Sequence, residues 1–302
     1  MNGYSPSQPN LSKKVIFIGV GGATCSGKTT LAKHLRSVLP GSVIIHQDDF
    51  APPEELVPIH PIYNVQDWDD PEGAIDWPRM VTFLRRVKET GILPEDHKSH
   101  DGLNKQDPMP IPQDVLDQWR SRFQEMQDSV RNSSGVEVVW GLVDGFLLYW
   151  HPGVIQALDT RIFLRVSYPT LKARRERRFG YHTAVQFSPE GSFWRDPPGY
   201  WDDIVWPAYL KAHGRIFEGG DIDHGIAALV DDEETATVSD KAMEIKVPKQ
   251  SATPGEMRAS ESKDELSRCG QPVPRLLVLP AEDLTMEQLF TAVCDRLLSL
   301  NS

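Results

Sequence analysis

A glycine-rich segment near the N-terminus has the residue types and the spacing of a phosphate-binding loop. It follows the pattern G-x-x-x-x-G-K-[ST], which here reads Gly22-Ala23-Thr24-Cys25-Ser26-Gly27-Lys28-Thr29. The glycines let the backbone approach a phosphate closely, so that successive N–H groups can surround its oxygens. Lys28 is expected to neutralise charge on the β- and γ-phosphates, and the Thr29 hydroxyl to bind Mg²⁺. Together with Thr30, the segment therefore predicts a site for ATP and Mg²⁺.

Two other interpretations of this segment are weaker. A glycine turn followed by an exposed lysine also fits the pattern, but it does not need the apolar run at 15–20 and the helical pattern at 29–39 that flank the segment. A dinucleotide-binding fingerprint needs a third glycine where Thr24 stands. The nucleoside triphosphate site therefore remains the prediction.

Acidic side chains follow two of the predicted strands, at the edge where a parallel sheet binds its ligands. Asp48 comes shortly after an apolar run at 43–45, and Asp144 ends another at 136–143. Asp48 could accept the proton of an attacking hydroxyl and help to hold the metal ion. Asp144 suits the second acid that organises Mg²⁺ in P-loop enzymes. Capping of a turn and solvation of a strand end are the alternatives, and the residue pattern alone does not decide between them.

Positioning these side chains requires strands that end side by side, and the hydrophobic pattern predicts them. Strand, helix and strand follow one another at 15–20, 29–39 and 43–45, which is one βαβ unit and favours parallel pairing. The other expected elements are strands at 136–143, 160–166 and 275–279, and helices at 78–89, 114–131 and 286–300. This order predicts an α/β protein with the three-layer P-loop NTPase fold and a central parallel sheet.

The composition bounds what the protein binds and where it works. The 302 residues carry a formal net charge of −11, which disfavours an extended basic surface for nucleic acid. Three cysteines are too few and too scattered for a disulfide framework, and no apolar stretch approaches the roughly 20 residues of a membrane span. We therefore expect a cytoplasmic protein that binds a small molecule, with no nucleic acid, no membrane and no obligate protein partner.

Four further segments are more restrictive than the phosphate loop. They are Gln47-Asp48-Asp49-Phe50, Trp68-Asp69-Asp70-Pro71, Asp144-Gly145-Phe146-Leu147-Leu148, and Pro198-Gly199-Tyr200-Trp201-Asp202 with Val205-Trp206-Pro207. With the stretch from Gly22 to Lys33, they resemble the nicotinamide riboside kinase family, within the wider uridine kinase and phosphoribulokinase group of P-loop kinases. The resemblance covers roughly residues 14–216 and the final strand and helix.

The resemblance implies roles that the residue pattern alone leaves open. It implies that Asp48 is the general base and a contact of Mg²⁺, and that the adjoining Asp49 and Phe50 belong to the substrate site. Asp69 would accept hydrogen bonds from the ribose hydroxyls, because one carboxylate can accept from two neighbouring hydroxyls. Trp68 would line the pocket for the base. A solvated acidic loop with a half-buried tryptophan is the alternative for the Trp68 segment.

An arginine-rich helix is expected after the strand at 160–166. Its run is Arg174-Arg175-Glu176-Arg177-Arg178, which by itself would be a charged helix face or a nuclear signal. In the resembling family this region is a mobile lid, here at about 174–205. The resemblance implies that Arg174 and Arg178 contact the ATP phosphates, and that Arg175 approaches the substrate and assists catalysis. It also implies that Tyr181 covers the substrate's base.

The chain departs from the family pattern in two ways. The family's second metal-organising acid is often glutamate, whereas Asp144 is shorter and would need a water molecule or a small backbone shift. Residues 91–112 and 219–274 are additional to the compact members. In the first of these, His97 and His100 could be read as a metal pair, but they lack the further ligands that a metal site needs.

The resemblance and the composition together divide the chain into four parts. Residues 1–13 are expected to be a disordered tail, and residues 14–218 the kinase core with its lid. Residues 219–274 are rich in Asp, Glu, Ser, Thr and Lys with few aromatic residues, which is typical of a disordered insertion. Residues 275–302 would complete the core with the final strand and helix.

These observations predict an ATP-dependent kinase that phosphorylates the 5′-hydroxyl of nicotinamide riboside in NAD biosynthesis, with nicotinic acid riboside as a second candidate substrate. A uridine or cytidine kinase is the nearest alternative. A protein that switches shape on binding a nucleotide is an alternative from another class, but it has no evident use for a base at Asp48 or a ribose contact at Asp69.

Overall fold

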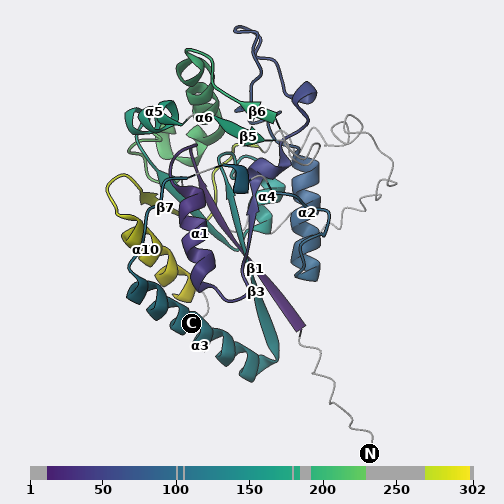
Figure 1. The fold of residues 1–302 in the computed structure, drawn as a ribbon, viewed down its shortest axis with the longest axis vertical. Helices are drawn as coiled ribbons and strands as arrows, with labels where there is room; N and C mark the ends of the chain where they lie inside the picture. The colour runs from purple at the N-terminus through teal and green to yellow at the C-terminus, as the bar shows by residue number, and fades with distance from the viewer. Residues whose placement is uncertain are drawn as a thin grey trace, which may run out of the picture.

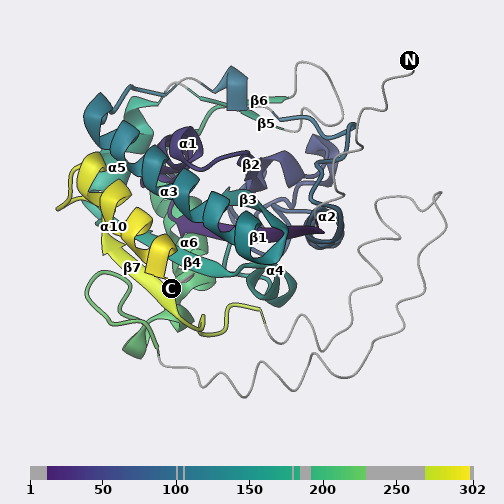
Figure 2. The same ribbon diagram turned by 90° about the horizontal axis from the view of Figure 1, so that it is seen from below.

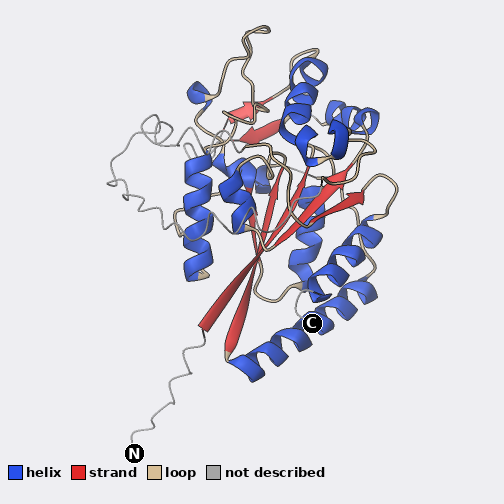
Figure 3. Cartoon of the chain, turned by 180° about the vertical axis from the view of Figure 1, so that it is seen from behind, coloured by secondary structure: helices blue, strands red, loops and turns tan. Residues whose placement is uncertain are grey.

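A parallel sheet of five strands forms the centre of the chain. The computed structural model describes residues 12–99, 101–104, 106–178, 180–183, 192–228 and 269–299. In these residues the sheet has the order β2-β3-β1-β4-β7, with β1 (Ser12–Gly22), β2 (Val43–His46), β3 (Val136–Gly145), β4 (Thr160–Arg165) and β7 (Leu276–Pro280). All four pairings are parallel, as the strand arrows in Figure 3 show. The predicted parallel sheet is therefore confirmed.

Helices cover both faces of this sheet (Figure 1, Figure 2). One face carries α1 (Lys28–Val38), α3 (Gln113–Ser134) and α10 (Met286–Ser299), and the other carries α2 (Trp77–Thr90), α4 (Pro152–Ala157) and α6 (Trp206–His213). The three layers match the predicted P-loop NTPase fold. Among the described helices, none combines the length and the apolar character needed to cross a bilayer.

The register of the sheet brings the ends of three strands together. β1 is the middle strand, and from Val15 to Gly22 every residue is buried, as expected of a strand covered on both faces. Val20 lies opposite Asp144, and Asp144 lies opposite His46 on the next strand. Because the strands are parallel, their carboxyl ends share one edge, where the phosphate loop and the short 3₁₀ helix η1 (Gln47–Phe50) also begin.

A smaller group of elements lies above this edge of the sheet (Figure 1). Helix α5 (Tyr168–Arg177) follows β4, and β5 (Tyr181–Thr183) pairs with β6 (Ser192–Trp194) in a two-stranded antiparallel sheet. A π-helical turn at Trp201–Val205 then leads directly into α6. These elements occupy the region that the resemblance assigned to the lid.

The described packing runs past the expected domain boundaries. β1 begins at Ser12, inside the predicted tail, and residues 1–11 lie outside the described residues. Ile222 is buried beyond the expected end of the core at 218, and Cys269 and Val273 are buried before its expected return at 275. Residues 229–268, the greater part of the predicted insertion, lie outside the described residues, so the disordered insertion stays a prediction.

Candidate active site

The phosphate loop joins the end of β1 to the start of α1. Gly22 and Gly27 have φ angles of 135° and 97°, which residues with a side chain rarely adopt. A Cβ at position 22 would also lie 2.5 Å from the carbonyl oxygen of Leu164, so there is no room for a side chain. The two glycines of the sequence pattern are therefore required by the backbone path of the loop.

Lys28 begins α1 and is buried inside this loop. Its Nζ donates a hydrogen bond to the carbonyl oxygen of Ala23 at 2.6 Å. Burial lowers the pKa of Lys28, and the nearby carboxylates of Asp144 and Asp48 oppose that shift without reversing it. A buried cation of this kind is stabilised by a further anion, which the phosphates of a nucleotide would provide.

Asp144, at the end of β3, has a polar partner for each carboxylate oxygen. Thr29 Oγ1 donates to Asp144 Oδ2 at 2.6 Å, and Asp144 Oδ1 lies 2.7 Å from His46 Nδ1. Burial alone would raise the pKa of Asp144, but the charge of His46 and the bonds from His46 and Thr29 lower it overall. Burial likewise opposes the charge on His46, yet Asp144 raises its pKa to about 9. At neutral pH the two side chains therefore form an ion pair.

Oxygen atoms suited to Mg²⁺ lie beside the phosphate loop. The Thr29 hydroxyl and the Asp144 carboxylate are adjacent, and the exposed Asp48 side chain lines the same cavity. These are the hard oxygen ligands that Mg²⁺ prefers. The described residues contain no cluster of three or more His, Cys, Asp and Glu that could hold a metal ion. Thr29 and the two carboxylates would thus supply only part of the coordination of Mg²⁺, with phosphate and water oxygens for the rest.

Two cavities meet at Asp48. The larger, of about 740 Å³, follows the phosphate loop and is lined by Lys28, Thr29 and Asp144. The smaller, of about 70 Å³, is lined by Trp68 and other aromatic side chains. The side chains that line both are Thr24, Asp48, Phe146, Tyr181 and His182. A phosphoryl group in the larger cavity and a hydroxyl in the smaller one would therefore both be close to the Asp48 carboxylate.

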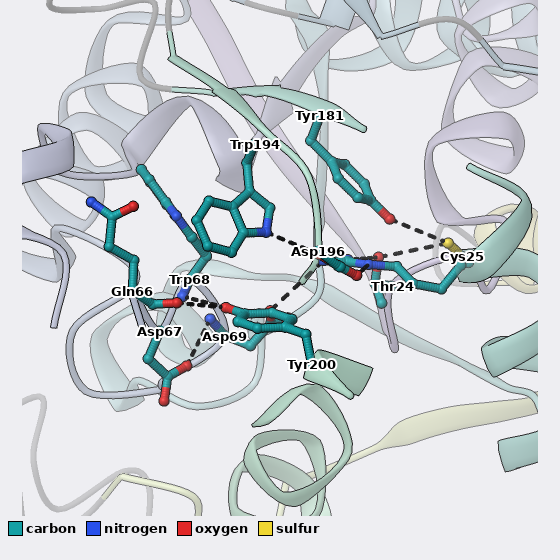
Figure 4. A network of polar contacts seen from close by, with 11 residues as sticks. Thr24, Cys25, Gln66, Asp67, Trp68, Asp69, Tyr181, Trp194, Asp196 and Tyr200 are labelled. Atoms are coloured by element: carbon teal, nitrogen blue, oxygen red, sulfur yellow. Dashed lines mark hydrogen bonds and ion pairs between the residues drawn. The ribbon is translucent and has the colours of Figure 1, made fainter. Parts of the chain in front are cut away.

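Two tryptophans line the smaller cavity, and both side chains are drawn in Figure 4. The rings of Trp68 and Trp194 have centroids 6.1 Å apart and an interplanar angle of 53°. The Tyr200 hydroxyl accepts a hydrogen bond from the backbone N–H of Trp68 at 3.0 Å and donates to the Gln66 carbonyl at 2.9 Å. These two bonds hold the Trp68 segment in place. The aromatic side chain nearest to Trp68 is thus Trp194, which the sequence motifs did not indicate; Tyr181 lines the same cavity, and its expected contact with the base stays a prediction.

Asp69 is a buried carboxyl in the same cavity. It is only 6% exposed, and its Oδ2 lies 3.9 Å from Arg175 Nη2. Burial raises the pKa of Asp69 to about 7, although the Arg175 charge acts in the opposite direction. A carboxylate at this depth needs hydrogen-bond donors, and the hydroxyls of a bound sugar would supply them.

Arg175 is buried at the boundary between the cavities. Its guanidinium forms two bonds to Asp196, at 2.6 Å and 2.8 Å, and donates to Thr24 Oγ1 at 3.0 Å. Its Cζ also lies 4.1 Å from the centroid of the Tyr181 ring. The bidentate contact with Asp196 fixes the plane of the guanidinium, so Arg175 is held in one orientation beside Asp69.

The neighbouring arginines line the larger cavity instead. Arg174 Nη1 donates to the Cys25 carbonyl at 3.2 Å, and Arg178 lies over the Tyr181 ring at 3.8 Å. Tyr181 also places its hydroxyl 3.6 Å from Cys25 Sγ. The structure therefore separates Arg174 and Arg178 from Arg175 in the way that the resemblance implied, and their roles stay predictions.

Asp49 and Phe50 face away from both cavities in the described structure. Phe50 packs against Phe83 and His97, with ring centroids 5.1 Å and 5.7 Å away, and Asp49 Oδ2 lies 3.5 Å from His97 Nε2. Both residues are at least 98% buried. In a 3₁₀ helix successive side chains point about a third of a turn apart, so Asp48 can face the cleft while its neighbours do not. The expected contact of Asp49 and Phe50 with substrate is not supported by their positions.

The additional segment 91–112 reaches the mouth of the larger cavity. Its Asn104 donates from Nδ2 to the His182 carbonyl and accepts at Oδ1 from the His182 N–H, both at 2.9 Å. Asp101, in the 3₁₀ helix η3 (Asp101–Leu103), forms an ion pair with Lys33 at 2.9 Å. The metal-pair interpretation is not supported, because His97 packs beside Asp49, and His100 lies outside the described residues.

Asp69→Asn is expected to stabilise the substrate-free protein above neutral pH. The carboxyl has a pKa of about 7 in the fold against 3.8 as its ordinary value, so the stability that it contributes is lost as the pH rises through about 7. Asparagine carries no charge to bury. The gain in the free energy of unfolding should be roughly 1–4 kcal/mol at about pH 8 and should shrink towards about pH 4.

Urea denaturation at several pH values measures this difference. The exposed Asp114→Asn on α3 is the matched control, and it should bring no such gain at about pH 8. If the free energy of unfolding of Asp69→Asn differed from that of the parent protein by the same amount at all pH values, the raised pKa of Asp69 would be contradicted.

Sequence comparison with known proteins finds several nicotinamide riboside kinases. No family model matches the chain. The nicotinamide riboside kinase of Saccharomyces cerevisiae is 36% identical over 215 residues, which are 70% of this chain and 83% of that protein. The Schizosaccharomyces pombe nicotinamide riboside kinase is 32% identical over 212 residues, 70% of this chain and 85% of that protein. Human nicotinamide riboside kinase 1 is 28% identical over 198 residues, 66% of this chain and 76% of that protein.

Among solved structures, an unliganded sugar kinase from Janibacter sp. HTCC2649 covers 64% of this chain and 98% of its own at 16% identity. Its TM-score of 0.23 is too low to support an argument, so the fold assignment rests on the strand order and the three layers described above.

Proposed function

The chain belongs to the nicotinamide riboside kinase family, and from this premise we propose that it transfers the γ-phosphoryl group of ATP to the 5′-hydroxyl of nicotinamide riboside, as a step of NAD biosynthesis. One observation carries the proposal to this chain's own residues. The cavity along the phosphate loop and the aromatic cavity meet at Asp48, whose side chain lines both. A phosphoryl donor and a hydroxyl acceptor need such a meeting point for in-line transfer.

The smaller cavity suits a riboside with a flat ring. Trp68 and Trp194 would contact the pyridinium ring, and Asp69 would accept from the two ribose hydroxyls. Arg175, held by Asp196, would lie beside the sugar and close to the transferred group. With its ring against the tryptophans and its ribose diol at Asp69, the riboside would direct its 5′-hydroxyl out of the smaller cavity towards Asp48.

The larger cavity suits the triphosphate. The loop N–H groups, Lys28, Arg174 and Arg178 would neutralise the phosphate charges. Asp48 would take the proton from the 5′-hydroxyl as the oxygen attacks the γ-phosphorus and the bond to the β-phosphate oxygen breaks. Enclosing these groups beside Tyr181 limits access of water, which would otherwise compete as the acceptor.

Thr29 and Asp144, with Asp48, would hold Mg²⁺ at the phosphates. When bound, the ion offsets negative charge on the phosphates and orients them. The ion pair with His46 keeps Asp144 ionised and available as an oxygen ligand at neutral pH.

A uridine or cytidine kinase is the second candidate, because a pyrimidine riboside offers the same ribose diol to Asp69. The two differ in the charge on the ring, since the pyridinium of nicotinamide riboside is a cation and uracil is neutral. The two tryptophans of the smaller cavity favour the cation, because the face of an aromatic ring attracts positive charge. ADP release measured with nicotinamide riboside, nicotinic acid riboside, uridine and cytidine tests the assignment directly.

Trp68→Leu should lower kcat/KM for nicotinamide riboside more than for uridine. Leucine keeps an apolar contact but loses the aromatic quadrupole that attracts a cation, worth on the order of 0.5–2 kcal/mol, or a few-fold to tens-fold in kcat/KM. Asp69→Ala should impair both substrates, because both present the same diol. Steady-state kinetics of the parent protein, Trp68→Leu and Asp69→Ala with both substrates measures these losses. A preference of the parent protein for uridine, or an equal loss on both substrates in Trp68→Leu, would replace the nicotinamide assignment with the pyrimidine one.

A further inference from the structure

Asp144 is fixed by side chains from two different elements. Thr29 of α1 donates to its Oδ2 at 2.6 Å, and His46 of β2 lies 2.7 Å from its Oδ1. The sheet register places His46 directly beside Asp144 on the neighbouring strand, so the backbone itself sets the approach of the ring. Both side chains line the larger cavity. The two contacts leave the carboxylate with one orientation about χ2, a torsion that is otherwise broad.

The imidazole of His46 faces a second carboxylate on its other side. Its Nε2 lies 4.0 Å from Asp101 Oδ2, and Asp101 is anchored to α1 by the 2.9 Å ion pair with Lys33. Asp101 belongs to the additional segment 91–112, so this segment contributes to the surroundings of the phosphate site. His46 thus lies between a carboxylate of the sheet and a carboxylate of the added segment, and its side chain is 11% exposed.

We propose that His46 is a positioning residue for Mg²⁺-bound ATP, because it holds the Asp144 carboxylate with Oδ2 directed at Thr29. The inference rests on the proposed nucleotide site but is independent of which riboside is phosphorylated. Rotation about χ2 of Asp144 would move Oδ2 away from the Thr29 hydroxyl, which now lies 2.6 Å from it. The hydrogen bond from His46 prevents that rotation, in the way that outer-sphere partners orient metal ligands.

Calorimetric titration of ATP in the absence of riboside tests the proposal without any catalytic turnover. In His46→Ala, ATP affinity in the presence of Mg²⁺ should fall about 10–100-fold, while affinity in EDTA should change by less than about threefold. His46→Asn keeps an N–H donor close to the position of Nδ1 and should recover part of the loss. His224→Ala, at a histidine whose side chain is 88% exposed, is the matched control and should bind like the parent protein.

A double-mutant cycle separates positioning from a general loss of structure. If His46 acts through Asp144, then His46→Ala should cost less than about threefold in Mg²⁺-dependent ATP affinity when Asp144→Asn is already present. Equal costs in both backgrounds would overturn the proposal. So would an equal loss of affinity with Mg²⁺ and with EDTA, or a His46→Asn protein that is as weak as His46→Ala. Failure of the riboside assignment would instead appear only in the ADP-release assay with ribosides.

Discussion

Asp48→Asn is expected to lower kcat for riboside phosphorylation by about 10²–10⁴-fold. Asparagine has nearly the same size but cannot take a proton from the 5′-hydroxyl, so the loss falls on the chemical step. The Asp48 side chain is exposed to the two cavities and lies outside the buried core, so the free energy of unfolding should hardly change. Rapid-quench measurement of a single turnover, with saturating ATP and the enzyme in excess over the riboside, isolates this step from product release.

The control for Asp48→Asn is Asp114→Asn, which removes a carboxylate from the exposed surface of α3. It should retain the parent rate. Near-normal single-turnover rates in a folded Asp48→Asn protein would exclude Asp48 as the base and would leave the meeting of the two cavities without its proposed chemistry.

Lys28→Ala is expected to reduce kcat/KM for ATP by at least about 10²–10³-fold, because the ammonium would stabilise charge that develops on the transferred phosphoryl group. The fold should survive this change. Burial lowers the pKa of Lys28, so keeping its charge inside the loop carries a cost, and the alanine protein is freed of that cost. Steady-state kinetics over a range of ATP concentrations, paired with thermal melting, measures both effects.

Lys14→Ala serves as the control for Lys28→Ala, because Lys14 is an exposed lysine on the same β1–α1 unit. It should leave ATP kinetics unchanged. A Lys28→Ala protein that melts at the parent temperature and turns over at the parent rate would remove the phosphate loop from the proposed mechanism.

Local patterns predict the elements of this fold more reliably than their ends or their order. The buried run of β1 was recognisable from its β-branched residues, but the strand extends outwards to Ser12, where exposed residues pair with β3. Such pairing depends on a partner that is more than a hundred residues away, so local hydrophobicity carries no sign of it. Helix α3 likewise runs three residues past its predicted end, to Ser134, and Gly135, with a positive φ of 67°, terminates it.

The residues of the candidate site also differ in whether local sequence patterns predict them. Asp48 and Asp144 could be found because ligand-facing side chains follow the carboxyl ends of parallel strands. His46 stands two residues before Asp48 at the end of the same strand, so the same rule could have identified it. Trp194 and Asp196 follow no such rule, since they reach the site through β6, and only tertiary packing brings them to Trp68 and Arg175.

Family resemblance has its own limit, which Asp49 and Phe50 illustrate. A motif transfers the neighbours of a functional residue along with the residue itself. Here the short helix η1 turns Asp48 towards the cavities and buries the next two side chains against α2 and His97. The direction of each side chain depends on the local helix geometry, and the presence of the motif does not specify it.

The two hydrogen bonds between Asn104 and His182 have a consequence for solubility and assembly. A pair of strands such as β5 and β6 has free edges, and an open edge can template pairing with a strand of another molecule. At β5 the side-chain amide of Asn104 occupies both the N–H and the carbonyl of His182, and so takes the place of a third strand. The added segment 91–112 therefore blocks edge-to-edge association at this point with a single side chain.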